Sequence, residues 1–311
     1  MNPPYQKTSV WEIILINNGS KKKVIAKIYG GLGNQLFQYA TGRRLAFITE
    51  SELLLDITWF TRKKNGGTTR KYELGALPIN ARICSGYENI ICRLTYSGLA
   101  RRMGIKTPFE LVLDNEKGVF SGSVLNMESG ILLYGHWQSE KYFEDVADLI
   151  RSELQDFSCF DNRDKDVVNK IKNTNSVAIH VRRGDYVTSP DAAATHGICP
   201  LSYYAKAVKF ISKKVNNPCY FIFSDDPDWA MNNLKTVGGE VFIMRNNLDN
   251  PIVDLNLMAL CKHQIIANSS FSWWGAWLNT NPMKIVIAPK QWFLNDKIKS
   301  SDLIPDAWEK L

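Results

Sequence analysis

Residues 176–186 read SVAIHVRRGDY, and this stretch sets the fold class that we expect for the second half of the chain. Its first four residues are largely apolar and β-branched, which predicts a buried strand. Arg182, Arg183, Gly184 and Asp185 follow directly, at the edge where ligands bind in open α/β sheets. A guanidinium matches phosphate geometry and stays charged at any working pH. The stretch therefore predicts either a phosphate-binding catalytic loop or an Arg–Asp pair that closes a strand end.

Strands and helices alternate after this point. The patterns predict strands and helices in turn at 176–181, 202–215, 220–223, 228–235, 241–244, 252–261, 264–267, 272–278 and 284–288. Such alternation is typical of parallel βαβ units with right-handed crossovers. The second half of the chain is therefore predicted to be a doubly wound domain of the nucleotide-binding type.

A similar unit comes first in the chain. A strand at 24–29, a glycine-rich turn, a helix at 36–48 and a strand at 53–57 form one β–loop–α–β unit. The polar stretch 161–175 indicates a boundary between two domains. We expect a leader or linker at 1–23, an N-terminal α/β domain at 24–160 and a C-terminal Rossmann-like domain at 161–311.

The composition favours a globular protein that binds an anionic small molecule. Of 311 residues, 45% are hydrophobic and 22% are charged, and the formal net charge is +7. The six cysteines form no C-x-x-C pair and the four histidines lack metal-ligand spacing, so neither a disulfide frame nor a zinc site is expected. Early apolar runs are too short for a signal peptide or a span, which predicts a cytoplasmic protein. The lysines at 21–23 suit a solvated linker or peripheral contact with lipid headgroups at the inner membrane; no nucleic-acid partner is expected.

Polar clusters follow three of the predicted strands, at 180–185, 224–227 and 268–275. They would converge at one edge of a parallel sheet. The third cluster precedes a helix, so its hydroxyl and N–H groups suit an anion, or one serine simply caps the helix. Asp225 could accept both donors of a guanine edge, or it could form a turn before Pro227.

Two further features have alternative interpretations. Asp226-Pro-Asp228 is similar to the D-x-D of metal-dependent sugar transferases, but the proline favours a turn, and we expect no essential metal. Trp273, Trp274 and Trp277 could stack on a sugar or, at helical spacing, form the core of a domain interface.

A dinucleotide site is the rival interpretation of the first unit. Gly31-x-Gly33 and the acid Asp56 approach the required fingerprint, but Leu36 occupies the third glycine position. An NAD-linked oxidoreductase is therefore disfavoured. The predicted edge combines an arginine, the start of a helix and an aspartate that could bind guanine. Together these groups suit a nucleotide-diphosphate sugar, and Arg182 would stabilise the negative charge on the departing diphosphate.

Five motifs in order resemble the bacterial α-1,2-fucosyltransferase family: GGLGNQLFQYA at 30–40, HWQSEKYF at 136–143, HVRRGDY at 180–186, FSDD at 223–226 and NSSFSWWGAWL at 268–278. The chain is similar, more distantly, to α-1,6- and protein O-fucosyltransferases. The resemblance implies a GT-B-like α/β fold, with two Rossmann-like domains facing a central cleft. It also implies GDP-fucose as donor, inversion at the anomeric carbon, no metal or other cofactor, and transfer to the 2-hydroxyl of a terminal β-galactoside in glycan synthesis.

The resemblance also implies roles for individual residues. Arg182 would grip the β-phosphate and His180 and Asp225 would read guanine. The other donor-binding residues would be Arg183, Asn268, Ser269, Ser270 and Phe271. The acceptor side of the cleft would contain Gly31, Gly33, Asn34, Gln35, His136 and Trp137, with His136 where the family commonly has tyrosine.

The proton acceptor is not fixed by these motifs. Asp185 is the first candidate for a catalytic acid–base group, and Asp191 is the second. Asp185 could instead only orient an arginine. The sequence leaves the acceptor glycan and the oligomeric state undetermined.

Overall fold

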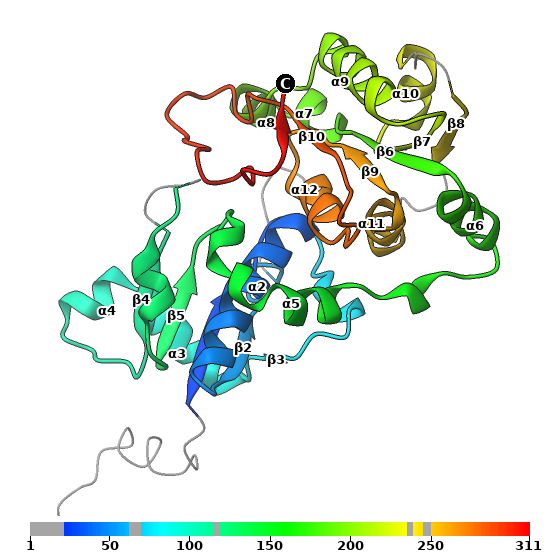
Figure 1. Ribbon diagram of the computed structural model, residues 1–311. Helices are drawn as coiled ribbons and strands as arrows, with labels where there is room; N and C mark the ends of the chain where they lie inside the picture. The colour runs from blue at the N-terminus through cyan, green and yellow to red at the C-terminus, as the bar shows by residue number, and fades with distance from the viewer. Residues whose placement is uncertain (1–21, 62–69, 115–118, 235–238, 245–249) are drawn as a thin grey trace, which may run out of the picture.

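The computed structural model describes residues 22–61, 70–114, 119–234, 239–244 and 250–311. Two parallel β-sheets, each covered by helices, face one another across the molecule (Figure 1). This confirms the expected α/β architecture with two Rossmann-like sheets. The first sheet lies within residues 23–134 and the second within residues 175–310. Among the described residues, no helix has both the length and the apolar character that a bilayer span would require.

The first sheet has five parallel strands in the order β3-β2-β1-β5-β4. Its central strand β1 is buried, as the apolar sequence predicts. The strands are β1 (Lys23–Lys27), β2 (Glu52–Asp56), β3 (Arg82–Ile83), β4 (Glu110–Leu113) and β5 (Ile131–Tyr134).

Helices cover both faces of this sheet. On one face lies α2 (Leu32–Ile48), which begins inside the glycine-rich motif rather than at residue 36 as the sequence predicted. On the other face, α3 (Gly86–Tyr96) is packed over Ile25, Leu54 and Leu132. The short helix α4 (Gly98–Arg102) follows it, and α5 (Ala147–Leu154) leads toward the second sheet.

The second sheet has six parallel strands in the order β11-β10-β9-β6-β7-β8. The chain order reverses at β6, between β7 and β9, and such a switch point is where doubly wound sheets bind ligands. The strands are β6 (Asn175–Val181), β7 (Pro218–Ser224), β8 (Val241–Met244), β9 (His263–Ile265), β10 (Val286–Ala288) and β11 (Glu309–Lys310).

Four helices of this half agree with the predicted pattern: α9 (Leu201–Lys214), α10 (Pro227–Asn233), α11 (Pro251–Leu260) and α12 (Ser270–Trp277). Three others were not predicted. Helix α6 (Lys165–Asn173) forms inside the polar stretch that indicated a boundary, and its one buried side chain, Ile171, joins the core. The short helices α7 (Gly184–Thr188) and α8 (Pro190–His196) lie between β6 and α9.

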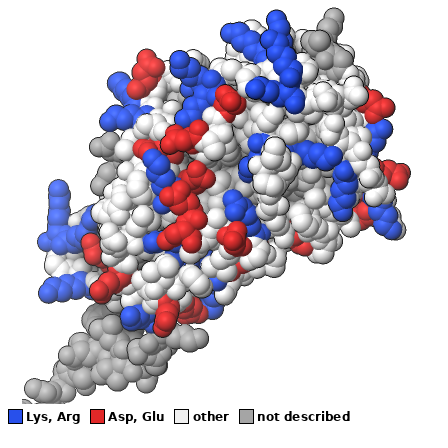
Figure 2. All heavy atoms as spheres, viewed as in Figure 1, with Lys and Arg blue, Asp and Glu red and all other residues white. Residues whose placement is uncertain are grey.

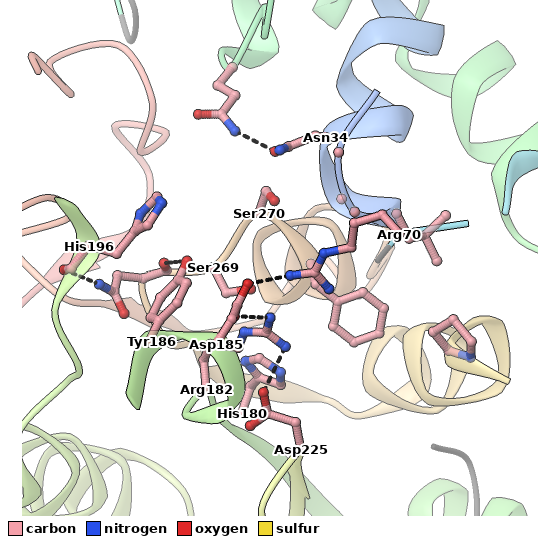
Figure 3. A pocket seen from close by; sticks show the side chains of 18 of the residues that line it. Asn34, Arg70, His180, Arg182, Asp185, Tyr186, His196, Asp225, Ser269 and Ser270 are labelled. Carbon is pink, nitrogen blue, oxygen red and sulfur yellow. Dashed lines mark hydrogen bonds and ion pairs between the residues drawn. The ribbon is translucent and has the colours of Figure 1, made fainter. Parts of the chain in front are cut away.

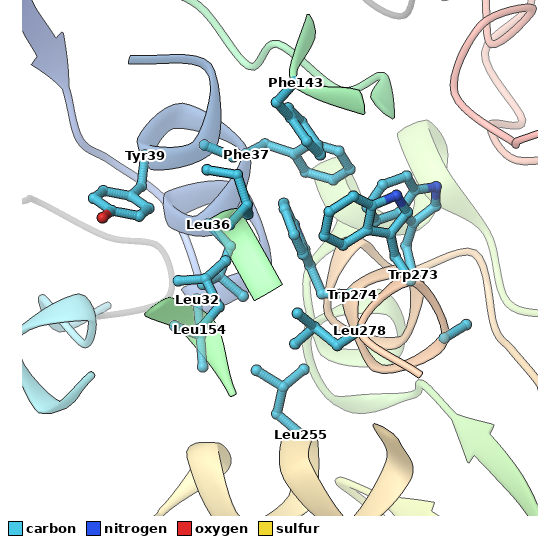
Figure 4. Close-up of a cluster of buried hydrophobic side chains, with 14 of the residues drawn as sticks. Leu32, Leu36, Phe37, Tyr39, Phe143, Leu154, Leu255, Trp273, Trp274 and Leu278 are labelled. Carbon is cyan, nitrogen blue, oxygen red and sulfur yellow. The ribbon is translucent and has the colours of Figure 1, made fainter. Parts of the chain in front are cut away.

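The two halves share one aromatic core, which joins α2 to α12 (Figure 4). The Phe37 ring lies 4.5 Å from the Trp273 ring and 5.0 Å from the Trp274 ring, and Phe143 stacks on Trp274 at 5.4 Å between centroids. Both tryptophans are fully buried, and Trp277 is 3% exposed. The interpretation of these tryptophans as interface core is confirmed, and the sugar-stacking alternative is wrong.

Candidate active site

A pocket of about 560 Å³ opens where the carboxyl ends of β6, β7 and β9 face the ends of β1 and β5 (Figure 3). Both sheets contribute to its wall. The residues singled out from the sequence that line it are Gly31, Gly33, Asn34, His136, His180, Arg182, Asp185, Asp225, Asn268, Ser269, Ser270 and Phe271. Most of the predicted site residues, which are distant in sequence, thus lie around one cavity.

Arg182 is fixed by two carboxylates at the base of the pocket. Its Nη2 donates to Asp185 Oδ1 at 2.5 Å, and its Nη1 lies 2.7 Å from Asp225 Oδ2. The other oxygen of Asp185 accepts from Arg70, which reaches across from the first half of the chain (Figure 3). The Arg–Asp pair predicted as an alternative to a ligand-binding loop is therefore present, and it lines the pocket as well.

The turn after β7 fixes Asp225. Its Oδ1 accepts the backbone N–H of Arg183 at 2.8 Å. The next residue, Asp226, caps α10 by accepting the N–H of Trp229 at 3.1 Å, with Pro227 in the first turn. The Asp-Pro-Asp sequence is therefore a helix-capping turn, as the proline indicated, and Asp225 is the acid of this turn that lines the pocket.

His180 is an uncharged polar group in the pocket wall. Burial, together with the nearby charge of Arg182, lowers its pKa to about 3, so the imidazole is neutral at any physiological pH. Its side chain is buried beside the Phe271 ring, and within the described chain its Nδ1 has no hydrogen-bond partner. A buried polar atom without a partner is destabilising, so this nitrogen is suited to pair with a ligand.

The start of α12 is open toward the pocket. Ser269 occupies the N-cap position but its side chain makes no capping hydrogen bond, so the predicted plain serine cap is not formed. The Ser272 hydroxyl donates back to the carbonyls of Ala267 and Ser269. No acidic residue lies in the first turn. The first N–H groups of a helix lack partners within the helix and attract anions, so this helix start suits a phosphate.

The start of α2 meets the start of α12 directly. A Cβ atom on Gly33 would lie 2.5 Å from the backbone of Ser270 and Phe271, which is closer than any side chain can fit. Gly33 therefore permits close contact between two helices, one from each half of the molecule. Near the same helix start, Glu73 lines the pocket. Burial raises the pKa of Glu73, while Arg70 and the Leu32 N–H act in the opposite direction.

The other residues assigned to the acceptor side differ in whether they line the pocket or support it from behind. The Asn34 side chain lines the pocket and accepts from Gln138 at 2.8 Å. Gln35 is fully buried and bonds the backbone of Gly30 and Glu73, so it supports the wall from behind. His136 lines the pocket beside the Tyr29 ring.

Several predicted residues point elsewhere or have structural contacts. Trp137 is buried in the core against Tyr142, outside the pocket lining. The Arg183 side chain turns away, pairs with Asp226 at 3.0 Å and covers the Trp229 ring at 3.9 Å. The Asn268 amide lines the pocket but donates to the carbonyls of His196, Gly197 and Trp292, where it ties loops together.

Three further observations concern residues that the sequence did not settle. Arg70 and Glu73 line the pocket, but they come from a region in which no motif was apparent. Tyr186 stacks on His196 at 4.7 Å within the same wall, and only the tertiary fold brings them together. Asp191 is not among the lining residues.

Asp56, the acid of the rival dinucleotide fingerprint, has no exposed surface. It accepts from Lys27 at 2.8 Å, from the Thr58 hydroxyl at 2.7 Å and from Tyr96 at 2.9 Å. Its oxygens are therefore committed to structural contacts and do not face a ligand. This removes the acid on which the NAD interpretation depended.

Comparison with known proteins gives a consistent family. A family model described as Glycosyl transferase family 11 matches residues 122–310. An α-1,2-colitosyltransferase of Escherichia coli is 34% identical over 298 residues, which cover 93% of this chain and 98% of that protein. The O-antigen biosynthesis glycosyltransferase WbnK of Escherichia coli is 32% identical over 308 residues, covering 91% of this chain and 98% of that protein. The solved fucosyltransferase NodZ from Bradyrhizobium gives a TM-score of 0.45 at 12% identity, over 82% of this chain and 93% of that one.

Proposed function

The chain belongs to glycosyl transferase family 11, and on this premise we propose that it transfers L-fucose from GDP-fucose to the 2-hydroxyl of a terminal β-galactoside. The transfer inverts the anomeric carbon and needs no metal ion. One observation supports the proposal most strongly: Arg182 and the uncapped start of α12 line the same pocket, at the switch point of the second sheet. Together they can hold a diphosphate.

The donor is proposed to bind with its diphosphate between Arg182 and the start of α12. Arg70, Arg182, Asp185 and Asp225 carry two positive and two negative charges, so this group is neutral as a whole. The additional attraction for a diphosphate then comes from the N–H groups of α12. As the sugar–oxygen bond breaks, negative charge grows on the departing phosphate, and donors already in place stabilise it.

Guanine is proposed to lie against His180 and Asp225. The free Oδ lone pairs of Asp225 can accept N–H donors of the base while its orientation is kept by Arg182 and the Arg183 N–H. The unpaired Nδ1 of neutral His180 offers a second contact. A guanine that bonds to Asp225 and to His180 would give the buried Nδ1 of His180 the hydrogen-bond partner that it lacks within the described chain.

Glu73 is the residue that we propose as proton acceptor for the sugar hydroxyl. Asp185 bridges two guanidiniums, which suits the orienting role that was its alternative. Asp191 lies outside the pocket lining. Glu73 lines the wall contributed by the first half of the chain, and its raised pKa makes it a stronger base than an ordinary carboxylate.

A second donor is favoured by a specific observation. The relative that is 34% identical over nearly the whole chain is named a colitosyltransferase. Colitose is L-fucose without its 3-hydroxyl, so GDP-colitose would fit the same diphosphate and guanine contacts. The choice between the two sugars then depends on contacts to one hydroxyl group.

A GDP-release assay tests the proposal. GDP-fucose and GDP-colitose are each supplied with lactose, N-acetyllactosamine or Gal-β1,3-GalNAc, with and without EDTA. We expect acceptor-dependent GDP release that EDTA does not reduce, and a fucosylated 2-hydroxyl in the product by NMR. Release with GDP-colitose alone would assign the second donor. No release with either donor, or release abolished by EDTA and restored by Mg²⁺, would contradict the proposal.

A further inference from the structure

The surface of α3, α4 and the following turn combines exposed apolar and basic side chains. It lies in the first half of the molecule, at the end remote from α12 (Figure 1). Ile90, Leu99 and Met103 are 56%, 69% and 68% exposed. Single exposed apolar residues are ordinary, but a group of them marks an interaction site. We call this the α3–α4 surface, and it consists of Ile90, Arg93, Leu99, Arg101, Arg102, Met103, Ile105 and Lys106.

The charges on this surface are of one sign. Arg93, Arg101, Arg102 and Lys106 are exposed, and residues 89–109 contain no aspartate or glutamate. Of the two acids that flank this range, Glu88 is buried and Glu110 is exposed at the start of β4. Lys and Arg side chains project from this end of the molecule in Figure 2. The α3–α4 surface is therefore complementary to an anionic partner.

The backbone holds these side chains outward in a fixed arrangement. The Met103 N–H donates to the Leu99 carbonyl at 3.0 Å, and the Ile105 N–H donates to the Ala100 carbonyl at 3.0 Å. Below them, the Thr95 hydroxyl donates to the Thr107 hydroxyl at 2.9 Å. The exposed apolar groups are thus attached to a hydrogen-bonded turn, so its backbone has little conformational entropy to lose on binding.

Helix α9 provides an internal contrast. It also carries exposed lysines, Lys206, Lys209 and Lys213, but its apolar face, with Val208 and Ile211, is buried against the second sheet. Apart from Leu201 at its start, the large apolar side chains of α9 are covered, which is what a solvated helix shows. The α3–α4 surface differs because, within the part of the chain that the structure describes, its apolar side chains Ile90, Leu99 and Met103 are more than half exposed.

We propose that the α3–α4 surface docks on an anionic lipid bilayer. A surface that carries apolar side chains next to arginine and lysine matches the boundary between acyl chains and lipid headgroups. The apolar side chains can enter the acyl region while the cations contact anionic headgroups. Cationic and apolar side chains also alternate within one short segment, as they do where a helix lies in the interface of an anionic membrane: Leu99, Arg101, Arg102, Met103, Ile105 and Lys106. The proposal does not depend on which nucleotide sugar the enzyme uses.

Vesicle co-sedimentation of the full chain tests this directly. Phosphatidylcholine vesicles with and without phosphatidylglycerol are compared at low and high salt. We expect binding only to the anionic vesicles, and weaker binding at high salt. The double variants Leu99→Ser/Met103→Ser and Arg101→Ala/Arg102→Ala should each lower the bound fraction by about tenfold. The variants Lys206→Ala/Lys209→Ala and Met283→Ser, at exposed positions elsewhere, should bind as the unaltered chain does.

The outcomes are distinct. Loss of binding in the two surface variants, with GDP release from a soluble acceptor unchanged, supports the proposal. Equal binding to neutral vesicles, or anionic binding that survives both surface variants, overturns it. No vesicle binding by the unaltered chain also overturns it, and would leave the α3–α4 surface to an acidic protein.

Discussion

Two helices begin at the same pocket, α2 from the first half of the chain and α12 from the second. They differ in what faces the N–H groups of their first turns. Helix α12 has no side-chain cap and no acid in its first turn. Helix α2 begins at Leu32 and its N-cap residue, Gly31, provides no side-chain cap, but Glu73 accepts from the Leu32 N–H. One positive helix end is thus left open and the other is already faced by a carboxylate.

This difference separates two kinds of chemistry within one cavity. An open helix start next to a guanidinium attracts an anion from solution. The start of α2 already faces a carboxylate and instead holds Glu73, the proposed proton acceptor, in place. The second half of the chain is therefore suited to the leaving group, and the first half to the attacking hydroxyl.

Arg182→Ala should give the largest effect, because it removes the charged donor on the side of the leaving group. We expect kcat/KM to fall by about 100- to 1,000-fold, as for loss of one preorganised donor. The matched control is the adjacent Arg183→Ala, whose side chain pairs with Asp226 outside the pocket. If the two variants lose activity equally, the open start of α12 does not mark the site of the diphosphate.

Glu73→Gln tests the opposite wall. Glutamine can still accept the Leu32 N–H, so the start of α2 is kept while the base is lost. We expect kcat to fall by about a hundredfold with little change in KM for the donor. Because the carboxylate must be ionised to act, activity of the unaltered enzyme should decline as pH falls through the raised pKa of Glu73. Asp191→Asn, an acid outside the pocket lining, should retain both rate and pH profile.

Gly33→Ala tests the contact between the two helix starts. Its Cβ would overlap the Ser270–Phe271 backbone, so the helices must separate. We expect a loss of about 1–3 kcal/mol in the free energy of unfolding, measured by denaturant titration, together with weaker GDP binding. Gly86→Ala, where nothing lies within 4 Å, is the control and should be neutral. A stable Gly33→Ala protein with normal GDP affinity would separate the helix contact from the site.

The effect expected from His180 is confined to acid. The folded pKa of His180 is about 3, whereas the unfolded chain has the ordinary value near 6.5. Between these values the unfolded state binds the extra proton, so stability is kept above about pH 6.5 and declines as the pH falls toward 3. This one residue contributes at most about 1.4 kcal/mol per pH unit. His180→Gln should show a shallower decline in thermal melts between pH 6 and 4; an unchanged slope would mean that His180 is not buried neutral.

The sequence predicted the second half of the fold better than the first. Strands β6, β7 and β10 are mainly apolar, because both faces of a parallel sheet are buried, and the alternating helices are clear between the strands. The start of α2 was placed too late because its glycines are poor helix formers, and the reason for Gly33 is a contact with a distant helix. Helices α7 and α8 are too short to show periodicity.

The site was predictable to the extent that its residues follow strands. His180, Arg182, Asp225 and Ser269 lie at strand ends, and parallel pairing brings them to one edge. Arg70 and Glu73 could not be found in this way, because they do not follow a predicted strand and belong to none of the motifs. Arg182 and Arg183 point in different directions because of the backbone conformation after β6. Two adjacent arginines in a sequence do not show which of them faces the pocket.

The aromatic core between α2 and α12 has a consequence for protein engineering. Phe37 and Phe143 come from one half and Trp273 and Trp274 from the other, and all four are almost fully buried. Either half produced alone would leave large rings in water and would tend to aggregate. Chimeras that combine the first half of one such chain with the second half of another must therefore keep α2, Phe143 and α12 as a matched set.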